Sequence, residues 1–371
     1  MLIVFSGNTS WSMYNFRLGV MKHFLNSGYK VCVVAPEDKY TAQIKAAGIE
    51  FIPVKNLKRS GNNPLKDLVL FFEYLKIYKF LKPDFIFHYT IKPNIYGALA
   101  AKISNIKNIS ITTGLGYAFS NKGLLYYFVK YLYKLSLSYP LEVWFLNNDD
   151  RIIFIKNKIV TAGKSYLLPG EGIDTNFFKP PAIYFESEVT TFILISRMLY
   201  DKGIKEYIDA IELLKEKGYS ISCLLLGQID NENPEAIAIE TIIGWQNKGF
   251  ITYLGQTTNV ISYIAKTHAV VLPSYREGVP RVLLEAASMG IPIITTRIPG
   301  CSDVVEDSIN GFLCTVKNSI DLAEKMEKFI LLSNKERIKM GIAGRKKMQE
   351  NFEEKIIIDI YKKKCEQYLF N

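Results

Sequence analysis

The sequence is poor in the residues that build metal centres and disulfide frameworks. Its 371 residues include five cysteines and three histidines, and no two cysteines form a CxxC pair. An odd, scattered set predicts reduced, mostly buried thiols and excludes both a zinc site and a disulfide scaffold. No apolar run approaches the roughly 18 residues of a spanning helix, and the first residues lack the basic segment of a signal peptide. The cysteines are Cys32, Cys223, Cys301, Cys314 and Cys365.

Acidic residues are scarce in the first half of the chain. Residues 1–180 carry 23 Lys and Arg against 11 Asp and Glu, whereas the remainder carries 23 against 25. The net charge of +10 therefore belongs to the first half. This asymmetry indicates that the first half meets an anionic partner, either nucleic acid or anionic lipid. A lysine-rich solubilising surface is the alternative.

Short apolar segments alternate with helix-like segments in the first half. The chain opens with a strand at 2–5, a loop that contains Gly7, and a helix from about 16 to 27. Because the strands are short and separated by helices, this alternation predicts parallel βαβ units in a doubly wound sheet. Further strands are expected at 29–35, 49–54, 84–89, 108–112 and 142–146.

A passage rich in proline and glycine, residues 168–181, resembles a linker. The alternation restarts with a strand at 191–196, and the final segment is amphipathic and long enough to pack back on the first domain. We therefore expect two Rossmann-like domains with a central cleft, where loops at the carboxyl ends of strands bind a ligand. Their expected bounds are 1–168, joined by a C-terminal helix at 353–371, and 169–352.

Several familiar signatures are incomplete. Gly114 and Gly116 supply two glycines of the dinucleotide fingerprint without the third, and Lys158 replaces the first glycine of a phosphate-binding P-loop. Neither HExxH nor GxSxG occurs. His23 and His268 fall inside an expected helix and strand, where packing is the simpler interpretation.

The strongest chemical constellation lies in residues 273–286. A strand ends at its start, and Pro280 is suited to the first turn of the helix that follows. Glu277 lies in the loop, where Gly278 lets backbone approach a ligand, and Glu285 lies in the helix. A carboxylate accepts from two hydroxyls at once, and free N–H groups at a helix start bind anionic oxygens. The pattern suits a polyhydroxylated, anionic ligand.

Two other loops follow strands in the same half. Arg197 and Lys202 come just after the strand at 191–196, and two cations at this spacing suit a diphosphate. An ordinary exposed loop is the alternative for that pair. Residues 295–311 form a third strand–loop–helix segment with a glycine in the loop.

Together these segments resemble the retaining glycosyltransferases of family 4, which have the GT-B fold. Glu277 and Glu285 match the E-x7-E motif of that family. The resemblance covers essentially the whole chain, and its N-terminal segments are similar to the capsule and lipid-linked-oligosaccharide branch, which includes PglA-type N-acetylgalactosaminyltransferases. The matching segments are YTIKPNIYGALAAK (89–102), ITTGLGYAF (111–119), PGEGIDTNFF (169–178), SRMLYDKG (196–203), PSYREGVPRVLLEA (273–286) and IPIITTRIPGCSDVVEDSINGFL (291–313).

The resemblance implies a hexosyltransferase that moves an N-acetylhexosamine or hexose from a UDP-sugar to a polyprenyl-diphosphate-linked saccharide. It implies no cofactor and no metal, because Arg, Lys and helix dipoles neutralise the leaving diphosphate; the absence of a DxD motif agrees. It implies a cytoplasmic enzyme, peripheral on the inner face of the cell membrane. Catalytic roles are implied for Arg197, Lys202 and Glu277. Donor contacts are implied for Gly7, Arg197, Lys202, Gly255, Gln256, Glu277, Gly278, Val279, Pro280 and Glu285.

One departure from the family concerns the strand that ends in Thr112 and Thr113. Many members place a histidine or an acidic residue there, and threonine cannot serve as a base. His88 ends the preceding strand and is the histidine nearest the expected cleft, with a packed role as the favoured alternative. A family-type front-face reaction needs no protein nucleophile, because the departing phosphate can take the acceptor's proton.

The basic half is expected to bind the acceptor and an anionic membrane surface. Segments 65–81 and 122–139 mix Lys with Tyr, Phe and Leu, as interfacial helices do. Packing on the sheet is the favoured interpretation for 65–81, and membrane contact for 122–139. Candidate acceptor contacts are Asn15, Arg17, His88, Lys92, Thr113 and Tyr117.

Two alternatives to a transferase remain open from the residues. One is a nucleotide-sugar epimerase or phosphorylase on the same fold, against which the paired glutamates and upstream cations argue. The other is a non-catalytic basic binding protein; no nucleic-acid motif accompanies the charge, so no nucleic-acid partner is expected.

Overall fold

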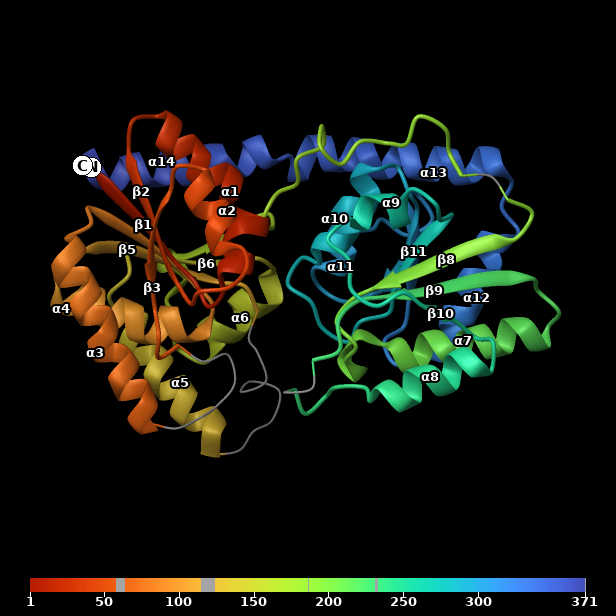
Figure 1. Ribbon diagram of the computed structural model, residues 1–371, viewed down its shortest axis with the longest axis horizontal. Coiled ribbons are helices and arrows are strands. Elements are labelled where there is room, and N and C mark those ends of the chain that lie inside the picture. The colour runs from red at the N-terminus through yellow and green to blue at the C-terminus, as the bar shows by residue number, and fades with distance from the viewer. Residues whose placement is uncertain (58–63, 115–123, 186, 231–232, 371) are drawn as a thin grey trace. The chain divides into compact units, whose positions relative to one another are not determined.

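The computed structural model describes residues 1–371 except 58–63, 115–123, 186, 231–232 and 371 (Figure 1). The chain divides into two compact units. Unit 1 comprises Met1–Glu171 and Glu354–Asn371, and unit 2 comprises Gly172–Glu353. Among the described residues, no helix is long and apolar enough to cross a membrane.

Within the described part of unit 1, seven parallel strands form one sheet in the order β3-β2-β1-β4-β5-β6-β7. Ser6 at the end of β1 lies between Val34 of β2 and His88 of β4. The strands are rich in β-branched and aromatic residues, and the inner strands are buried on both faces, as parallel strands covered by helices are. They are β1 (Leu2–Ser6), β2 (Lys30–Ala35), β3 (Glu50–Pro53), β4 (Phe85–Tyr89), β5 (Lys107–Thr112), β6 (Glu142–Phe145) and β7 (Ser165–Leu167).

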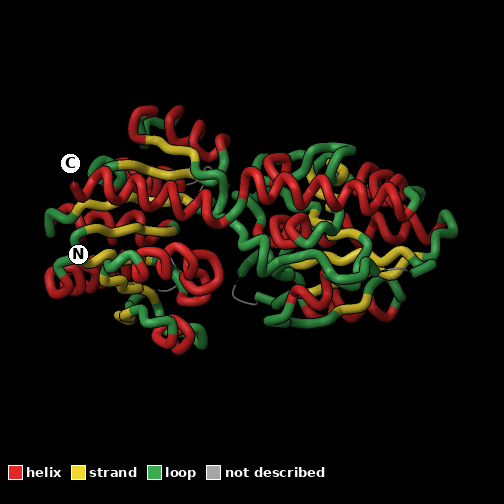
Figure 2. Tube along the Cα trace, turned by 90° about the horizontal axis from the view of Figure 1, so that it is seen from above, coloured by secondary structure: helices red, strands yellow, loops and turns green. Residues whose placement is uncertain are grey.

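Helices cover both faces of this sheet (Figure 2). On one face Leu70 and Tyr74 of α3 pack against Ile86 of β4. On the other face, rings of α1 and α14 pack against strand aromatics, as in the Phe5–Phe24 and Phe87–Tyr361 pairs. The helices are α1 (Ser10–Asn26), α2 (Thr41–Ala46), α3 (Pro64–Leu81), the π-helix η1 (Pro93–Gly97), α4 (Ala98–Ile103), α5 (Leu124–Ser136), α6 (Asn148–Lys156), the 3₁₀ turn η3 (Ala162–Lys164) and α14 (Glu354–Phe370).

The described part of unit 2 holds a six-stranded parallel sheet in the order β10-β9-β8-β11-β12-β13. Its strands are β8 (Thr190–Ile195), β9 (Ile221–Leu226), β10 (Thr252–Tyr253), β11 (Ala269–Leu272), β12 (Ile293–Thr296) and β13 (Gly311–Cys314). Its helices are η4 (Tyr200–Lys202), α7 (Ile204–Glu216), α8 (Ile239–Asn247), α9 (Val260–Ile264), α10 (Arg281–Ser288), α11 (Cys301–Val304), α12 (Ser319–Ile330), α13 (Asn334–Lys347) and the π-helix η5 (Met348–Phe352). Both sheets confirm the predicted fold class of two doubly wound α/β domains.

Two helices of unit 1 differ from the sequence-based expectation. The first helix begins at Ser10 rather than near residue 16, because the Thr9 side chain caps it by accepting from Ser12 N. Helix α6 was not expected at all; the Asn147 side chain caps its start by accepting from Asp150 N. In both cases a capping side chain, rather than apolar periodicity, fixes where the helix begins.

Candidate functional site

In unit 2, loops that follow neighbouring strands meet at the carboxyl edge of the sheet. Gly203 has φ +71°, and a Cβ there would overlap the Pro273 carbonyl. Gly300 has φ +78°, and a Cβ there would overlap the carbonyl of Gly278. Only glycine combines this backbone conformation with so close an approach. The loops after β8, β11 and β12 are therefore packed against one another.

Lys202 and Glu277 form the centre of this loop cluster. The Lys202 Nζ donates to Glu277 Oε1 at 2.7 Å, and the two side chains are 14% and 16% exposed. Burial opposes the charge of Lys202, but the neighbouring carboxylates of Glu277 and Asp201 outweigh it and raise the lysine pKa. Lys202 is therefore a fixed positive charge at neutral pH.

Arg197 lies on the loop directly after β8. Its Nη1 donates to Asp230 Oδ2 at 2.8 Å, and its side chain is 41% exposed. The charge of Arg197 is close enough to Lys202 to act against the rise in that lysine's pKa. The two cations predicted from their spacing therefore lie close enough for their charges to interact.

Glu285 lies inside α10, one turn after Arg281. Its Oε1 accepts from Arg281 Nε at 3.1 Å. Burial raises the pKa of Glu285, and the Arg281 guanidinium opposes that rise. The helix begins after Pro280 with no side-chain cap, and Gly278 and Val279, which precede it, are half-buried.

The loop after β10 contains the two residues expected beside the base. Gly255 has φ +68°, and its carbonyl accepts from Gly227 N at 2.7 Å, whereas the next residue, Gln256, is exposed.

The residues of unit 1 that were expected to contact the donor or the acceptor lie in several different environments. Gly7 follows β1 and donates its N–H to Val34 O at 3.1 Å. Asn15 Nδ2 donates to Trp11 O within α1 at 2.8 Å. Thr113 is half-buried just past β5. Tyr117 lies outside the described residues.

Arg17 is 2% exposed, which places its guanidinium in the interior rather than at a surface. It pairs with Glu171, donates from Nη1 to Ser12 O at 2.9 Å, and lies 4.4 Å from the centre of the Tyr89 ring. This arrangement is that of a structural arginine, and it leaves the expected acceptor contact without support.

His88 is fully buried, and its Nε2 lies 2.9 Å from Tyr78 OH. Burial lowers its pKa to about 3, so the imidazole is neutral at physiological pH. This environment favours the packed role over a site role. Lys92 lies past the same strand and pairs with Asp67 of α3 at 2.9 Å.

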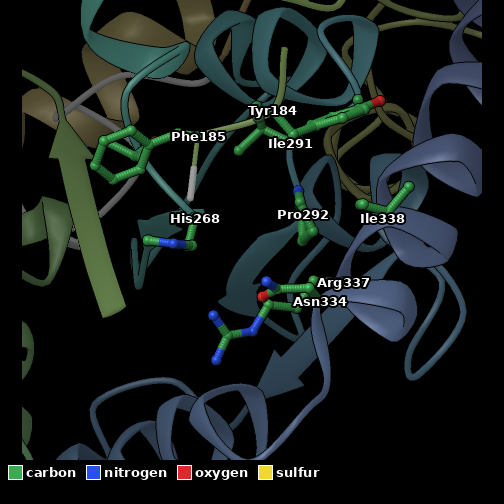
Figure 3. Close-up of a pocket in the computed structure, with 10 residues that line it drawn as sticks. Tyr184, Phe185, His268, Ile291, Pro292, Asn334, Arg337 and Ile338 are labelled. Carbon is green, nitrogen blue, oxygen red and sulfur yellow. The ribbon is translucent and has the colours of Figure 1, made fainter. Parts of the chain in front are cut away.

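A separate pocket lies at the opposite, amino edge of the unit 2 sheet (Figure 3). His268 and Pro292, which line it, immediately precede β11 and β12. His268 Nδ1 accepts from Thr191 N at 2.9 Å, and burial, followed by Arg337, lowers its pKa to about 4. The expected donor residues do not line this pocket.

Among the described residues no cluster of three or more His, Cys, Asp or Glu could hold a metal ion.

Comparisons with known proteins define the class. Residues 2–154 match the family model "Glycosyl transferase 4-like", and residues 178–347 match "Glycosyl transferases group 1". The chain is 30% identical, over all of both sequences, to the N,N'-diacetylbacillosaminyl-diphospho-undecaprenol alpha-1,3-N-acetylgalactosaminyltransferase of Campylobacter jejuni. It is 26% identical to the capsular polysaccharide biosynthesis glycosyltransferase CapM of Staphylococcus aureus, over 82% of this chain and 85% of that protein.

Among solved structures, Anabaena Alr3699/HepE in complex with UDP has a similar fold, with a TM-score of 0.80 and 17% identity over 99% of this chain and 100% of that one. The fold and the full-length relative together define a hexosyltransferase with the GT-B fold. The chain belongs to the group 1, family 4-like glycosyltransferases.

The sequence reasoning missed the partners of the predicted residues. Asp230 and Asp67, which pair with Arg197 and Lys92, lie 33 and 25 residues from them. No local pattern links such pairs. Arg281 and Glu285 are four residues apart in a helix, so their ion pair could have been predicted from spacing alone.

Proposed function

We propose that this glycosyltransferase moves an N-acetylhexosamine or hexose from a UDP-sugar to a saccharide carried on a polyprenyl diphosphate, with retention of the anomeric configuration. The observation that carries the donor side is the charged cluster of Arg197, Lys202 and Glu277 at one sheet edge. The acceptor class is taken from the relatives, whose names include a diphospho-undecaprenol acceptor and capsular polysaccharide synthesis. These relatives do not favour an epimerase or a non-catalytic binding protein.

On this proposal the donor diphosphate binds beside both Arg197 and Lys202. Arg197 and Lys202 neutralise the charge that develops as the sugar–phosphate bond breaks, and the N–H groups at the start of α10 add to this. Glu277 binds sugar hydroxyls and stays oriented by Lys202. Glu285 binds the ribose hydroxyls, and Gly255 and Gln256 lie beside the base. Neutralisation by these side chains is the reason to propose a reaction without metal or other cofactor.

In the proposed front-face step, the acceptor hydroxyl attacks the anomeric carbon on the face from which the diphosphate leaves. The new glycosidic bond forms as the sugar–phosphate bond breaks, and the departing phosphate oxygen takes the hydroxyl proton. Atoms and charges balance without a protein nucleophile. The neutral, buried His88 is not needed in this step.

The proposed membrane contact rests on two helices of unit 1. Helix α5 has an outer face of Tyr127, Phe128, Tyr131 and Leu135, which are 43% to 65% exposed. Helix α3 has a similar face of Leu65, Leu68, Val69 and Phe72, which are 51% to 75% exposed. In chain order α3 is the next element after β3, and α5 is the next after β5, which is the order of crossover helices that begin at the carboxyl edge of a parallel sheet. Exposed apolar and aromatic stripes flanked by lysines are typical of helices that lie in an anionic membrane surface. We infer an enzyme peripheral on the inner face of the cell membrane.

Transfer from a panel of UDP-sugars tests this function. Labelled UDP-N-acetylgalactosamine, UDP-N-acetylglucosamine, UDP-galactose and UDP-glucose would each be incubated with polyprenyl-diphosphate-linked saccharides in anionic vesicles. We expect one donor to give a lipid-linked product whose anomeric configuration by NMR matches the donor. Absence of transfer from all of them, or an inverted product, would contradict the proposal.

A further inference from the structure

Asp67, in the first turn of α3, fixes two side chains that are distant in sequence. One carboxylate oxygen accepts from Lys92 Nζ at 2.9 Å, and the other accepts from Tyr96 OH at 2.9 Å. The Lys92 and Asp67 side chains are only 20% and 14% exposed. Burial, followed by Asp67, raises the pKa of Tyr96, so the phenol remains a donor at neutral pH. Asp67 is therefore a two-point clamp on residues 92–96.

The clamped segment has an unusual backbone. Thr90, directly after β4, has φ +71°, a conformation that a β-branched residue rarely adopts. The chain then enters the π-helix η1, a form that often marks functional sites. Thr90 Oγ1 and Asn94 Oδ1 are buried, with no hydrogen-bond partner among the described residues. Strain and unpaired polar atoms of this kind concentrate where a site is held ready for a ligand.

The clamp lies at the sheet edge where an acceptor is expected. Strand β4 lies between β1 and β5, so the residue that follows it is next to Gly7 and Thr113, which directly follow those two strands. The same turn of α3 presents Leu65 and Leu68 outward, on the proposed membrane face. A diphosphate on a membrane lipid lies at the headgroup level, directly beyond such a face. The start of α3 therefore carries both part of the proposed membrane face and the carboxylate of Asp67, which pairs with Lys92.

We propose that Asp67 is a positioning residue that holds the Lys92 ammonium against the diphosphate of the lipid-linked acceptor. The carboxylate of Asp67 accepts from the Lys92 ammonium and so fixes the position of that charge. Asp67 itself touches no substrate and acts through Lys92. This inference rests on the proposed function and adds the group that recognises the acceptor's diphosphate.

The test measures the KM for the acceptor and for the UDP-sugar separately, in Asp67→Asn, Lys92→Met and the double variant. We expect each single change to raise the acceptor KM about tenfold, the size typical of losing one coupled charged contact, with the donor KM unchanged. The double variant should match Lys92→Met alone, because Asp67 has no route to the acceptor except through that lysine. Glu73→Gln is the matched control, since Glu73 on the same helix accepts from Lys55 N and Asn56 N instead. It should leave the acceptor KM unchanged even where it lowers the melting temperature.

A binding measurement separates this inference from the proposed function. A short-chain isoprenyl diphosphate should bind the wild-type protein more tightly than the matching monophosphate, and Asp67→Asn and Lys92→Met should both remove that preference. Wild-type protein that transfers no sugar to any lipid-linked acceptor, yet shows this preference, contradicts the function alone. The positioning role is overturned if a folded Asp67→Asn variant keeps both the preference and the wild-type acceptor KM. It is also overturned if the double variant has a higher acceptor KM than Lys92→Met alone.

Discussion

Replacing Lys202 by methionine is the sharpest perturbation of the proposed donor site. The side chain is only 14% exposed, and its charge is maintained by Glu277 and Asp201. On the proposed mechanism this charge meets the leaving diphosphate in a partly desolvated site. Removing one such preorganised group costs about 3–4 kcal/mol of transition-state stabilisation, so kcat should fall by about 10²–10³.

The matched control for this change is Lys205→Met, three residues further on. Lys205 pairs with Asp209 at 2.7 Å, but the two side chains are 59% and 37% exposed. Exposed pairs contribute about 0–1 kcal/mol, so this variant should keep wild-type kcat and nearly the same stability. Transfer would be measured at saturating donor and acceptor, with circular dichroism to establish folding. A folded Lys202→Met protein with wild-type kcat would show that this lysine does not stabilise the leaving diphosphate.

Three further predictions concern pH, the membrane and metals. The pKa of His88 is about 3 in the folded protein, which is below its unfolded value, so the protein should lose stability as pH falls from about 6.5 toward 3. In urea titrations, His88→Gln should reduce the slope of unfolding free energy against pH by about 1.4 kcal/mol per pH unit in that range. An unchanged slope would contradict a buried, neutral His88. Serine at Phe128, Tyr131 and Leu135 should weaken sedimentation with anionic vesicles by at least about tenfold, since each side chain contributes on the order of 1 kcal/mol on burial, while unaltered co-sedimentation would count against the interface. Transfer assayed after exhaustive treatment with a chelator should match the untreated rate; restoration of a lost rate by added Mg²⁺ or Mn²⁺ would show that a metal is needed.

Much of the fold was accessible from the sequence because local chemistry determines it. The strands expected at 29–35 and 191–196 contain the continuous apolar runs VCVVA and FILI between helix-like segments, and such runs predict buried parallel strands. The start of the first helix was missed because Thr9 caps it ahead of the apolar periodicity. Helix α6 was missed because it begins with polar residues and spans only Asn148–Lys156.

The candidate site was accessible only where its residues follow a local motif. Lys202 and Glu277 could be named from their loops, but their 2.7 Å contact depends on two loops 75 residues apart. Arg17 was expected to contact the acceptor, but its side chain pairs with Glu171, which is 154 residues away. Burial of a charged side chain is a tertiary property, because it depends on which distant segment supplies the counter-charge.

A crystal structure of the protein with an intact UDP-sugar would test the proposed donor site. We expect the diphosphate oxygens to lie within hydrogen-bond distance of Arg197 and Lys202, with the sugar hydroxyls on Glu277 and the ribose on Glu285. A nucleotide bound elsewhere in unit 2, for instance beside His268 at the amino edge of the sheet, would contradict it.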